Sequence, residues 1–131
     1  MNEINPLAGS YFCEDLGIEL LEWADGRSII ALEITQRLGN RLGMAHGGVI
    51  ATLADQSLGL AWRSTALDRK PGGTINLNVN FIAPGSGRLT AEGRLVKLTG
   101  SCAFCEGKIY NAKRELIATA QGTFSARRIN L

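Results

Sequence analysis

The residues of this chain that could do chemistry lie around its single histidine, His46. Two glycines, Gly47 and Gly48, follow the histidine and open a segment with helical spacing. The first backbone N–H groups of a helix have no partner within the helix, and that end of the helix attracts negative charge. Glycine at this point lets an oxygen atom approach the backbone without meeting a Cβ atom. The stretch therefore predicts a site that could stabilise an oxyanion.

A single carboxylate, Asp55, interrupts the apolar helix that this stretch begins. No other side chain between Gly47 and Trp62 is ionisable, and a helix that is apolar on nearly all sides is normally buried. Burying an unpaired carboxylate is costly, so we expect Asp55 to be a sequestered acid that is kept for its function. The alternative is a structural carboxylate at a partly exposed position or beside an arginine. Together, an acid and an oxyanion site predict a catalytic centre.

The spacing of the two candidate groups indicates a site shared by two chains. His46 and Asp55 are nine residues apart, which places them about 180° apart around a helix axis and about 13.5 Å apart along it. Groups separated in this way cannot readily act on one atom within a single chain. A two-fold dimer could bring the helix start of one subunit to Asp55 of the other.

The elements that must position these groups follow from the hydrophobic periodicity and the turn residues. The helix that carries Asp55 has a core stripe at helical spacing, formed by Ile50, Leu53, Ala54, Ser57, Leu58 and Ala61. The predicted elements are a helix from Pro6 to about Asp15 with Asn5 as its cap, strands within 17–23 and 27–35, a loop over 36–45, a helix from Gly47 to about Thr65, and strands within 74–83, 88–98, 101–110 and 115–126.

This element order predicts an α+β fold. Strands connected by hairpins, such as the pair around the Asp25-Gly26 turn, favour an antiparallel sheet. The long apolar helix is the element able to cover the inner face of that sheet. One helix cannot cover both faces, so we expect dimerisation. A chain of 131 residues fits a single domain, here residues 1–131, with one core.

Composition argues against several other classes of protein. The net charge is only +2 and the basic residues are scattered, so neither nucleic acid nor a membrane is expected as the main partner. The first residues lack the basic start and apolar run of a signal peptide, and no segment approaches the ~20 apolar residues that span a bilayer. Three cysteines do not make a disulfide framework. We therefore expect a reduced, cytoplasmic protein.

Cys102 and Cys105 form a C-x-x-C motif, which can indicate zinc or redox chemistry. The motif lies in a strand-like run, where residues three apart point to opposite faces. The chain has one histidine and no second C-x-x-C motif, so we expect small core residues and no metal site. The alternating Asn76, Asn78 and Asn80 predict a solvated or subunit-contacting sheet face.

The sequence N-R-L-G-M-A-H-G-G at 40–48, followed by L-A-D at 53–55, resembles the signature of hotdog-fold acyl-CoA thioesterases of the PaaI-like (phenylacetic acid degradation) branch. The resemblance extends from the first strand to about Phe124. It implies an antiparallel sheet wrapped around one long central helix, and a homodimer or homotetramer with active sites at the dimer interface. It also implies an acyl- or aryl-CoA substrate, with coenzyme A present only as part of that substrate and with no other cofactor.

The resemblance implies a role for each matching residue. Asp55 would be the nucleophile, or the general base that activates water at the thioester carbonyl. The Gly47 N–H would polarise the carbonyl oxygen. Asn40 matches the family's amide near the thioester, His46 would orient the loop or contact the sulfur side, and Thr74 would hold the attacking water. Taken alone, His46 fits a structural histidine, Asn40 a turn residue and Thr74 a strand residue.

Two alternative functions remain open on the sequence. One is a hotdog dehydratase acting on hydroxyacyl thioesters, although such enzymes use a histidine–acid pair in a different sequence context. The other is a non-catalytic acyl-CoA-binding protein that regulates a partner, against which the retention of Asp55 argues. The phosphates of coenzyme A would need basic residues, and Arg88, Arg127 and Arg128 are candidates between which the sequence does not decide.

Overall fold

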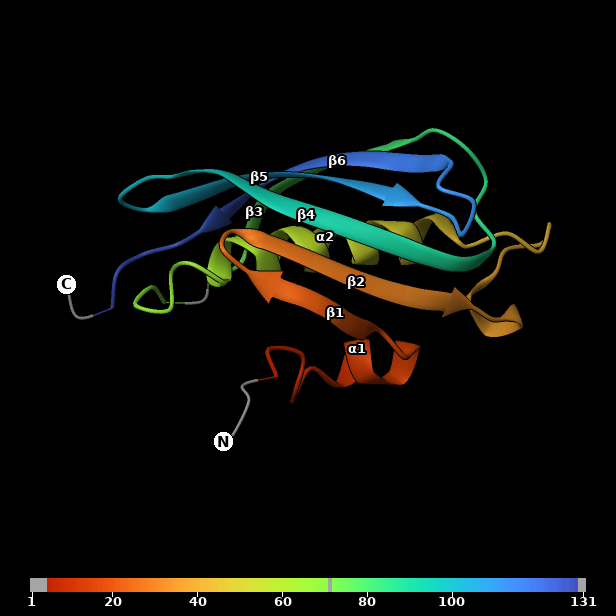
Figure 1. Ribbon diagram of the computed structural model, residues 1–131, viewed down its shortest axis with the longest axis horizontal. Coiled ribbons are helices and arrows are strands. Elements are labelled where there is room, and N and C mark those ends of the chain that lie inside the picture. Colours follow the sequence, from red (N-terminus) through yellow and green to blue (C-terminus); the bar gives the residue numbers. More distant parts are fainter. Residues whose placement is uncertain (1–4, 71, 130–131) are drawn as a thin grey trace.

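The computed structural model describes residues 5–70 and 72–129, which form a curved antiparallel sheet around one long helix (Figure 1). The six strands have the order β1-β2-β4-β5-β6-β3. This confirms the α+β hotdog architecture expected from the sequence. The elements are α1 (Tyr11–Leu16), β1 (Glu19–Ala24), β2 (Arg27–Ile34), the 3₁₀ helix η1 (Gln36–Leu38), α2 (Gly47–Arg63), β3 (Thr74–Phe81), β4 (Gly87–Leu98), β5 (Cys102–Tyr110) and β6 (Leu116–Ser125).

The first hairpin is held to the end of the long helix by its turn. Asp25 and Gly26 both have positive φ, 54° and 79°, as a two-residue hairpin turn of the primed type requires. The Gly26 N–H donates to Ser64 Oγ at 2.8 Å, just beyond the last turn of α2. The Asp25-Gly26 pair therefore joins β1 to β2 and also fixes the hairpin against the helix.

Helix α2 packs against the sheet with the stripe that its periodicity predicted. All six stripe residues are buried, namely Ile50, Leu53, Ala54, Ser57, Leu58 and Ala61. The helix lies close to the sheet at Gly93 of β4 and Gly107 of β5, which are paired across the strands. A Cβ atom on Gly93 would overlap the Ser57 carbonyl, and one on Gly107 would lie 2.9 Å from the Leu58 side chain. These two glycines fix the position of α2 on the sheet, and with it the position of Asp55.

Gly93→Ala is expected to lower the free energy of unfolding by about 2–3 kcal/mol, because the new methyl group must push the backbone of α2 away from the sheet. Urea denaturation followed by circular dichroism would measure the loss. Gly100→Ala is the matched control, since a Cβ there meets no atom within 4 Å. Equal stability of the two variants would contradict the close packing described here.

The N-terminal helix is shorter than the sequence predicted. Asn5 does accept a backbone hydrogen bond, at 3.0 Å from Leu7, but this closes a turn and does not start a helix. Gly9 then takes a left-handed conformation with φ of 84°, which interrupts any helix that begins at Pro6. The predicted start was therefore wrong and α1 begins at Tyr11.

The two edges of the sheet differ in how they are covered. Helix α1 lies next to the β1 edge (Figure 1). At the other edge, β3 presents Ile75 and Phe81 with exposed fractions of 61% and 56%. An unpaired strand edge is a template for pairing with another chain. The strand's asparagines are on the face away from α2, where Asn80 Nδ2 donates to Thr119 Oγ1 at 3.1 Å.

No helix in the described part of the chain is long and apolar enough to cross a membrane. The cytoplasmic location stays a prediction.

Candidate active site

The structure brings two of the expected site residues, Asp55 and Thr74, into direct contact. Thr74 is the first residue of β3, and its hydroxyl donates to Asp55 Oδ1 at 2.6 Å. Oδ2 accepts no hydrogen bond from residues 5–70 and 72–129, and no basic side chain in these ranges pairs with the carboxylate. The carboxylate is therefore oriented through one oxygen while the other is available to water or substrate.

Asp55 is half-buried in the single chain and not sequestered. The expectation of a buried acid was wrong for the isolated subunit, because the strand beside it is the open edge of the sheet. Thr74 is itself exposed. A partner covering β3 would be needed to remove Asp55 from water.

The start of α2 forms the second part of the candidate site. His46 is the N-cap residue, and its Nδ1 accepts a hydrogen bond from the Gly48 N–H at 2.9 Å. This bond ties the imidazole to the first turn of α2. The neighbouring Gly47 N–H has no acceptor within the described ranges. Gly47 is exposed, so this N–H is available to an incoming oxygen atom.

Asn40 organises the loop that leads into the helix. Its Oδ1 accepts hydrogen bonds from the backbone N–H groups of Leu42 and Met44 at 2.8 and 3.2 Å. A backbone bond from His46 to Leu38, 2.9 Å long, closes the same loop. The amide oxygen of Asn40 is thus occupied locally, and no hydrogen bond joins its side chain to the helix start. In the single chain Asn40 fits the structural role of a turn residue.

The two parts of the site lie at opposite ends of the same edge strand. Eight residues separate Gly47 from Asp55 on α2, which corresponds to about 12 Å along the helix. Phe81, at the far end of β3 from Thr74, lies against Gly47, where a Cβ atom would be 3.6 Å from the Phe81 ring. Phe81 was not among the site residues predicted from the sequence, although its place at the opposite end of the Thr74 strand was a usable signal.

Residues 42–118 match the family model of the thioesterase superfamily. The chain belongs to this superfamily. A Pseudomonas aeruginosa protein that is provisionally named an esterase is 32% identical over 120 residues, covering 90% of this chain and 84% of its own. The match confirms the expectation of a thioester hydrolase.

Solved structures agree with this assignment. A mutant of the phenylacetic acid degradation protein PaaI from Thermus thermophilus superposes with a TM-score of 0.80 at 27% identity, covering 91% of this chain and 99% of its own. The protein smu.793 from Streptococcus mutans, solved with bound acetyl-CoA, has a TM-score of 0.78 at 26% identity, with coverage of 86% and 90%. These similarities confirm the resemblance to PaaI-like proteins.

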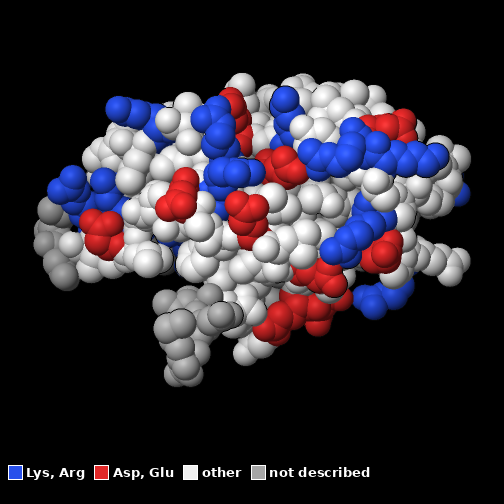
Figure 2. Space-filling view, in the orientation of Figure 1, with Lys and Arg blue, Asp and Glu red and all other residues white. Residues whose placement is uncertain are grey.

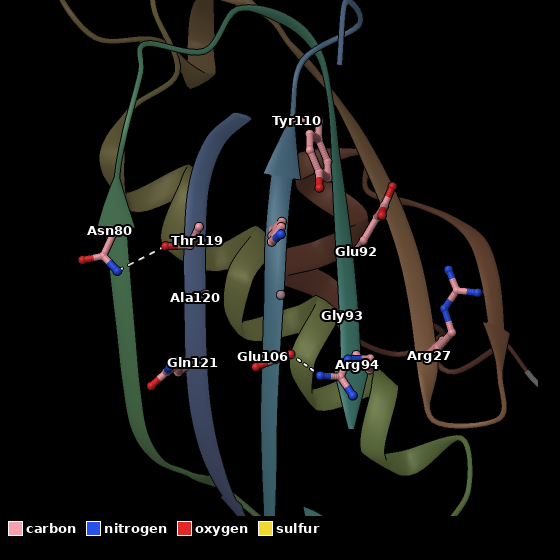
Figure 3. A pocket seen from close by; sticks show the side chains of 12 residues that line it. Arg27, Asn80, Glu92, Gly93, Arg94, Glu106, Tyr110, Thr119, Ala120 and Gln121 are labelled. Atoms are coloured by element: carbon pink, nitrogen blue, oxygen red, sulfur yellow. Dashed lines mark hydrogen bonds and ion pairs between the residues drawn. The ribbon is translucent and has the colours of Figure 1, made fainter. Parts of the chain in front are cut away.

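The thioesterase also has a polar hollow of about 430 Å³ on the sheet face opposite α2 (Figure 3). Arg27, Glu92 and Arg94 project from this face, and Arg94 pairs with Glu106. Glu92 is paired with Arg114 at 2.8 Å. These charges are largely neutralised by one another, and they lie across the sheet from the helix that carries Asp55. The hollow contributes nothing to the site at β3.

Of the two cysteines in the C-x-x-C motif, Cys105 is a small core residue as expected, whereas Cys102 is only partly buried. Cys105 and Cys13 are buried, and burial raises the pKa of the Cys105 thiol to about 12. A thiol with so high a pKa stays protonated near neutral pH and is a poor nucleophile. Within the described ranges, no three His, Cys, Asp or Glu side chains are grouped so that they could hold a metal ion.

Proposed function

We propose that this thioesterase hydrolyses an acyl- or aryl-CoA thioester to the free carboxylic acid and coenzyme A, at a site built by two subunits. One observation carries the proposal: the oriented carboxylate and the free helix N–H flank opposite ends of one exposed edge strand. The acetyl-CoA in the Streptococcus mutans structure supports coenzyme A thioesters as the substrate class.

Antiparallel pairing of β3 with β3 of a second copy would complete the site. β3 has one extra residue between Thr74 and Asn76, where its register shifts. With the two-fold axis at Asn78, Thr74 of one subunit therefore stands opposite Phe81 of the other. Asp55 then comes beside Gly47 of the second subunit, and the exposed apolar side chains of the strand become covered. Two equivalent sites form in the homodimer, and two such dimers would make the homotetramer expected from the sequence.

The mechanism follows from these positions. The thioester carbonyl oxygen accepts a hydrogen bond from the Gly47 N–H, which with the helix dipole stabilises the oxyanion as negative charge develops. Asp55 of the other subunit takes a proton from a water molecule that the Thr74 hydroxyl oxygen helps to hold. The water oxygen attacks the carbonyl carbon, the C–S bond breaks, and the thiolate of coenzyme A takes up the proton. His46 keeps the helix start in place.

The same carboxylate could instead attack the carbonyl carbon directly and form an acyl-enzyme anhydride. Single turnover in ¹⁸O-labelled water distinguishes the two routes. Label in Asp55 arises only by direct attack, when water opens the anhydride at the Asp55 carboxyl carbon, whereas general-base catalysis places the label only in the released acid.

Thiol release from a panel of alkyl- and aryl-CoA thioesters tests the proposed function. We expect turnover of at least one class of thioester, unchanged by a metal chelator, because the proposed mechanism uses no metal. Stoichiometric acyl-CoA binding without thiol release would instead support the regulatory binding protein. Formation of an enoyl thioester from a hydroxyacyl thioester would support the dehydratase.

A further inference from the structure

A basic hollow of about 190 Å³ lies beside the end of β3 that carries Thr74. It forms where the segment before β3 runs antiparallel to the segment after β6. The Ser125 N–H donates to the Gly73 carbonyl at 3.0 Å, and the Lys70 N–H donates to the Arg127 carbonyl at 2.7 Å. The residues that line the hollow are Lys70, Gly72, Ser125 and Arg127.

The two cationic side chains that line this hollow have no anionic partner among residues 5–70 and 72–129. The ion pairs found there involve Arg27, Arg88, Arg94 and Arg114. Figure 2 shows basic side chains near the C-terminal end of the chain, at the left of the view, with acidic side-chain atoms beside them. Two like charges held on one concave surface repel each other, and an anion between them removes that repulsion.

The neighbouring Arg69 has a different role, since its guanidinium is already bound by the protein. Its Nη1 donates to the carbonyls of Thr99 and Ala126, both at 2.8 Å. These bonds hold the segment that carries Lys70 against the segment that carries Arg127. The cationic pair is therefore displayed by a fixed backbone arrangement.

The hollow is within reach of the reaction centre. Thr74 is paired with Phe124, and Arg127 follows Phe124 by three residues, which corresponds to about 10 Å of extended chain. The pantetheine arm, which separates a thioester from the phosphates of coenzyme A, can span at least this distance. Arg and Lys are the side chains that bind phosphate best, through charge-assisted hydrogen bonds.

We propose that Lys70 and Arg127 bind the phosphates of the coenzyme A part of the substrate, an inference that rests on the proposed thioesterase function. It separates two of the three candidates that the sequence left open, Arg88 and Arg127. Arg88 is already paired with Glu19 at 2.7 Å, whereas Arg127 lines a hollow beside the end of β3 that carries Thr74. Lys70 was not a candidate on the sequence, because its partner lies 57 residues further along the chain.

The proposal is tested with one acyl group carried on three thiols: coenzyme A, dephospho-coenzyme A and N-acetylcysteamine, which has no phosphate. For Lys70→Ala and Arg127→Ala we expect KM for the acyl-CoA to rise by about tenfold each, the loss of one charge-assisted contact, with kcat within about twofold of wild type. The N-acetylcysteamine thioester should show no change in kcat/KM. Arg88→Ala is the matched control and should leave all three substrates unaffected.

The dephospho substrate identifies which phosphate is bound. If the effect of the variants disappears with it, the contact is to the 3′-phosphate. If the effect persists, the contact is to the diphosphate. An unchanged KM for acyl-CoA, or an equal rise for the N-acetylcysteamine thioester, would overturn the proposal.

Calorimetric binding of free coenzyme A separates this inference from the proposed function, because it needs no turnover. Weaker binding by both variants, in a protein that releases no thiol, would uphold the phosphate site and contradict the thioesterase reaction. Undiminished binding, in a protein that does release thiol, would contradict the phosphate site and leave the reaction standing. Unchanged thermal unfolding of the variants would show that the fold is intact.

Discussion

Asp55→Asn is expected to reduce kcat for thiol release by about 1,000-fold, because the amide can neither take a proton from water nor attack a carbonyl carbon. The substitution keeps the size of the side chain, and its Oδ1 can still accept the hydrogen bond from Thr74. Stability should therefore change little. Steady-state thiol release at saturating substrate, with thermal unfolding measured alongside, gives both quantities.

Two further variants test whether the loss of kcat comes from the Asp55 carboxylate itself. Asp15→Asn neutralises an exposed acid of α1 and should leave kcat unchanged. Thr74→Val removes the hydroxyl that orients Asp55 and should lower kcat by a smaller factor, about tenfold, the share of one positioning hydrogen bond. An Asp55→Asn enzyme within tenfold of the wild-type rate would show that another group activates the water.

The periodic elements could be predicted from the sequence because their burial pattern is local. The stripe from Ile50 to Ala61 could be predicted from the spacing of apolar residues alone, and all of its members are buried. The hairpin could be predicted because Asp25-Gly26, a turn signal, lies between two strand-like runs. The start of α1 could not be predicted in this way, because the left-handed Gly9 overrides the favourable Asn5-Pro6 signal.

Only part of the candidate site could be predicted from local spacing. The separation of His46 from Asp55 followed from helix geometry alone, since both lie on one helix. The contact between Asp55 and Thr74 joins residues 19 apart on different elements, so only the family resemblance pointed to Thr74. The partial exposure of Asp55 was missed because it depends on which strand lies at the sheet edge. Strand order is a property of the whole topology and not of local spacing.

The Gly47→Pro substitution is expected to lower kcat by about 100- to 1,000-fold, the usual cost of removing one oxyanion donor. Proline deletes the N–H but is well suited to the first position of a helix. The residue before a proline must be extended, and His46 already has φ −60° and ψ 141°. The helix should therefore form normally, and the loss should fall on kcat and not on stability.

Gly47→Ala is the matched control for this variant, since it adds a Cβ but keeps the N–H. That Cβ would lie 3.6 Å from the Phe81 ring, an ordinary contact, so we expect at most a small loss of activity. If Gly47→Ala lowers kcat as much as Gly47→Pro does, the reaction depends on the space at Gly47 and not on its N–H.

Mixing the two inactive proteins tests whether the site is shared between subunits. A mixed dimer of Asp55→Asn and Gly47→Pro chains has one site in which both changes meet and one site in which Asp55 and Gly47 are both intact. Equal mixing with free exchange makes half of the dimers mixed, so about a quarter of the wild-type activity should return. If each chain held a complete site, no mixture could exceed the activity of its parts. Mixed dimers that form, shown by tagged subunits, but stay inactive would therefore contradict the two-chain site and the β3 pairing that creates it.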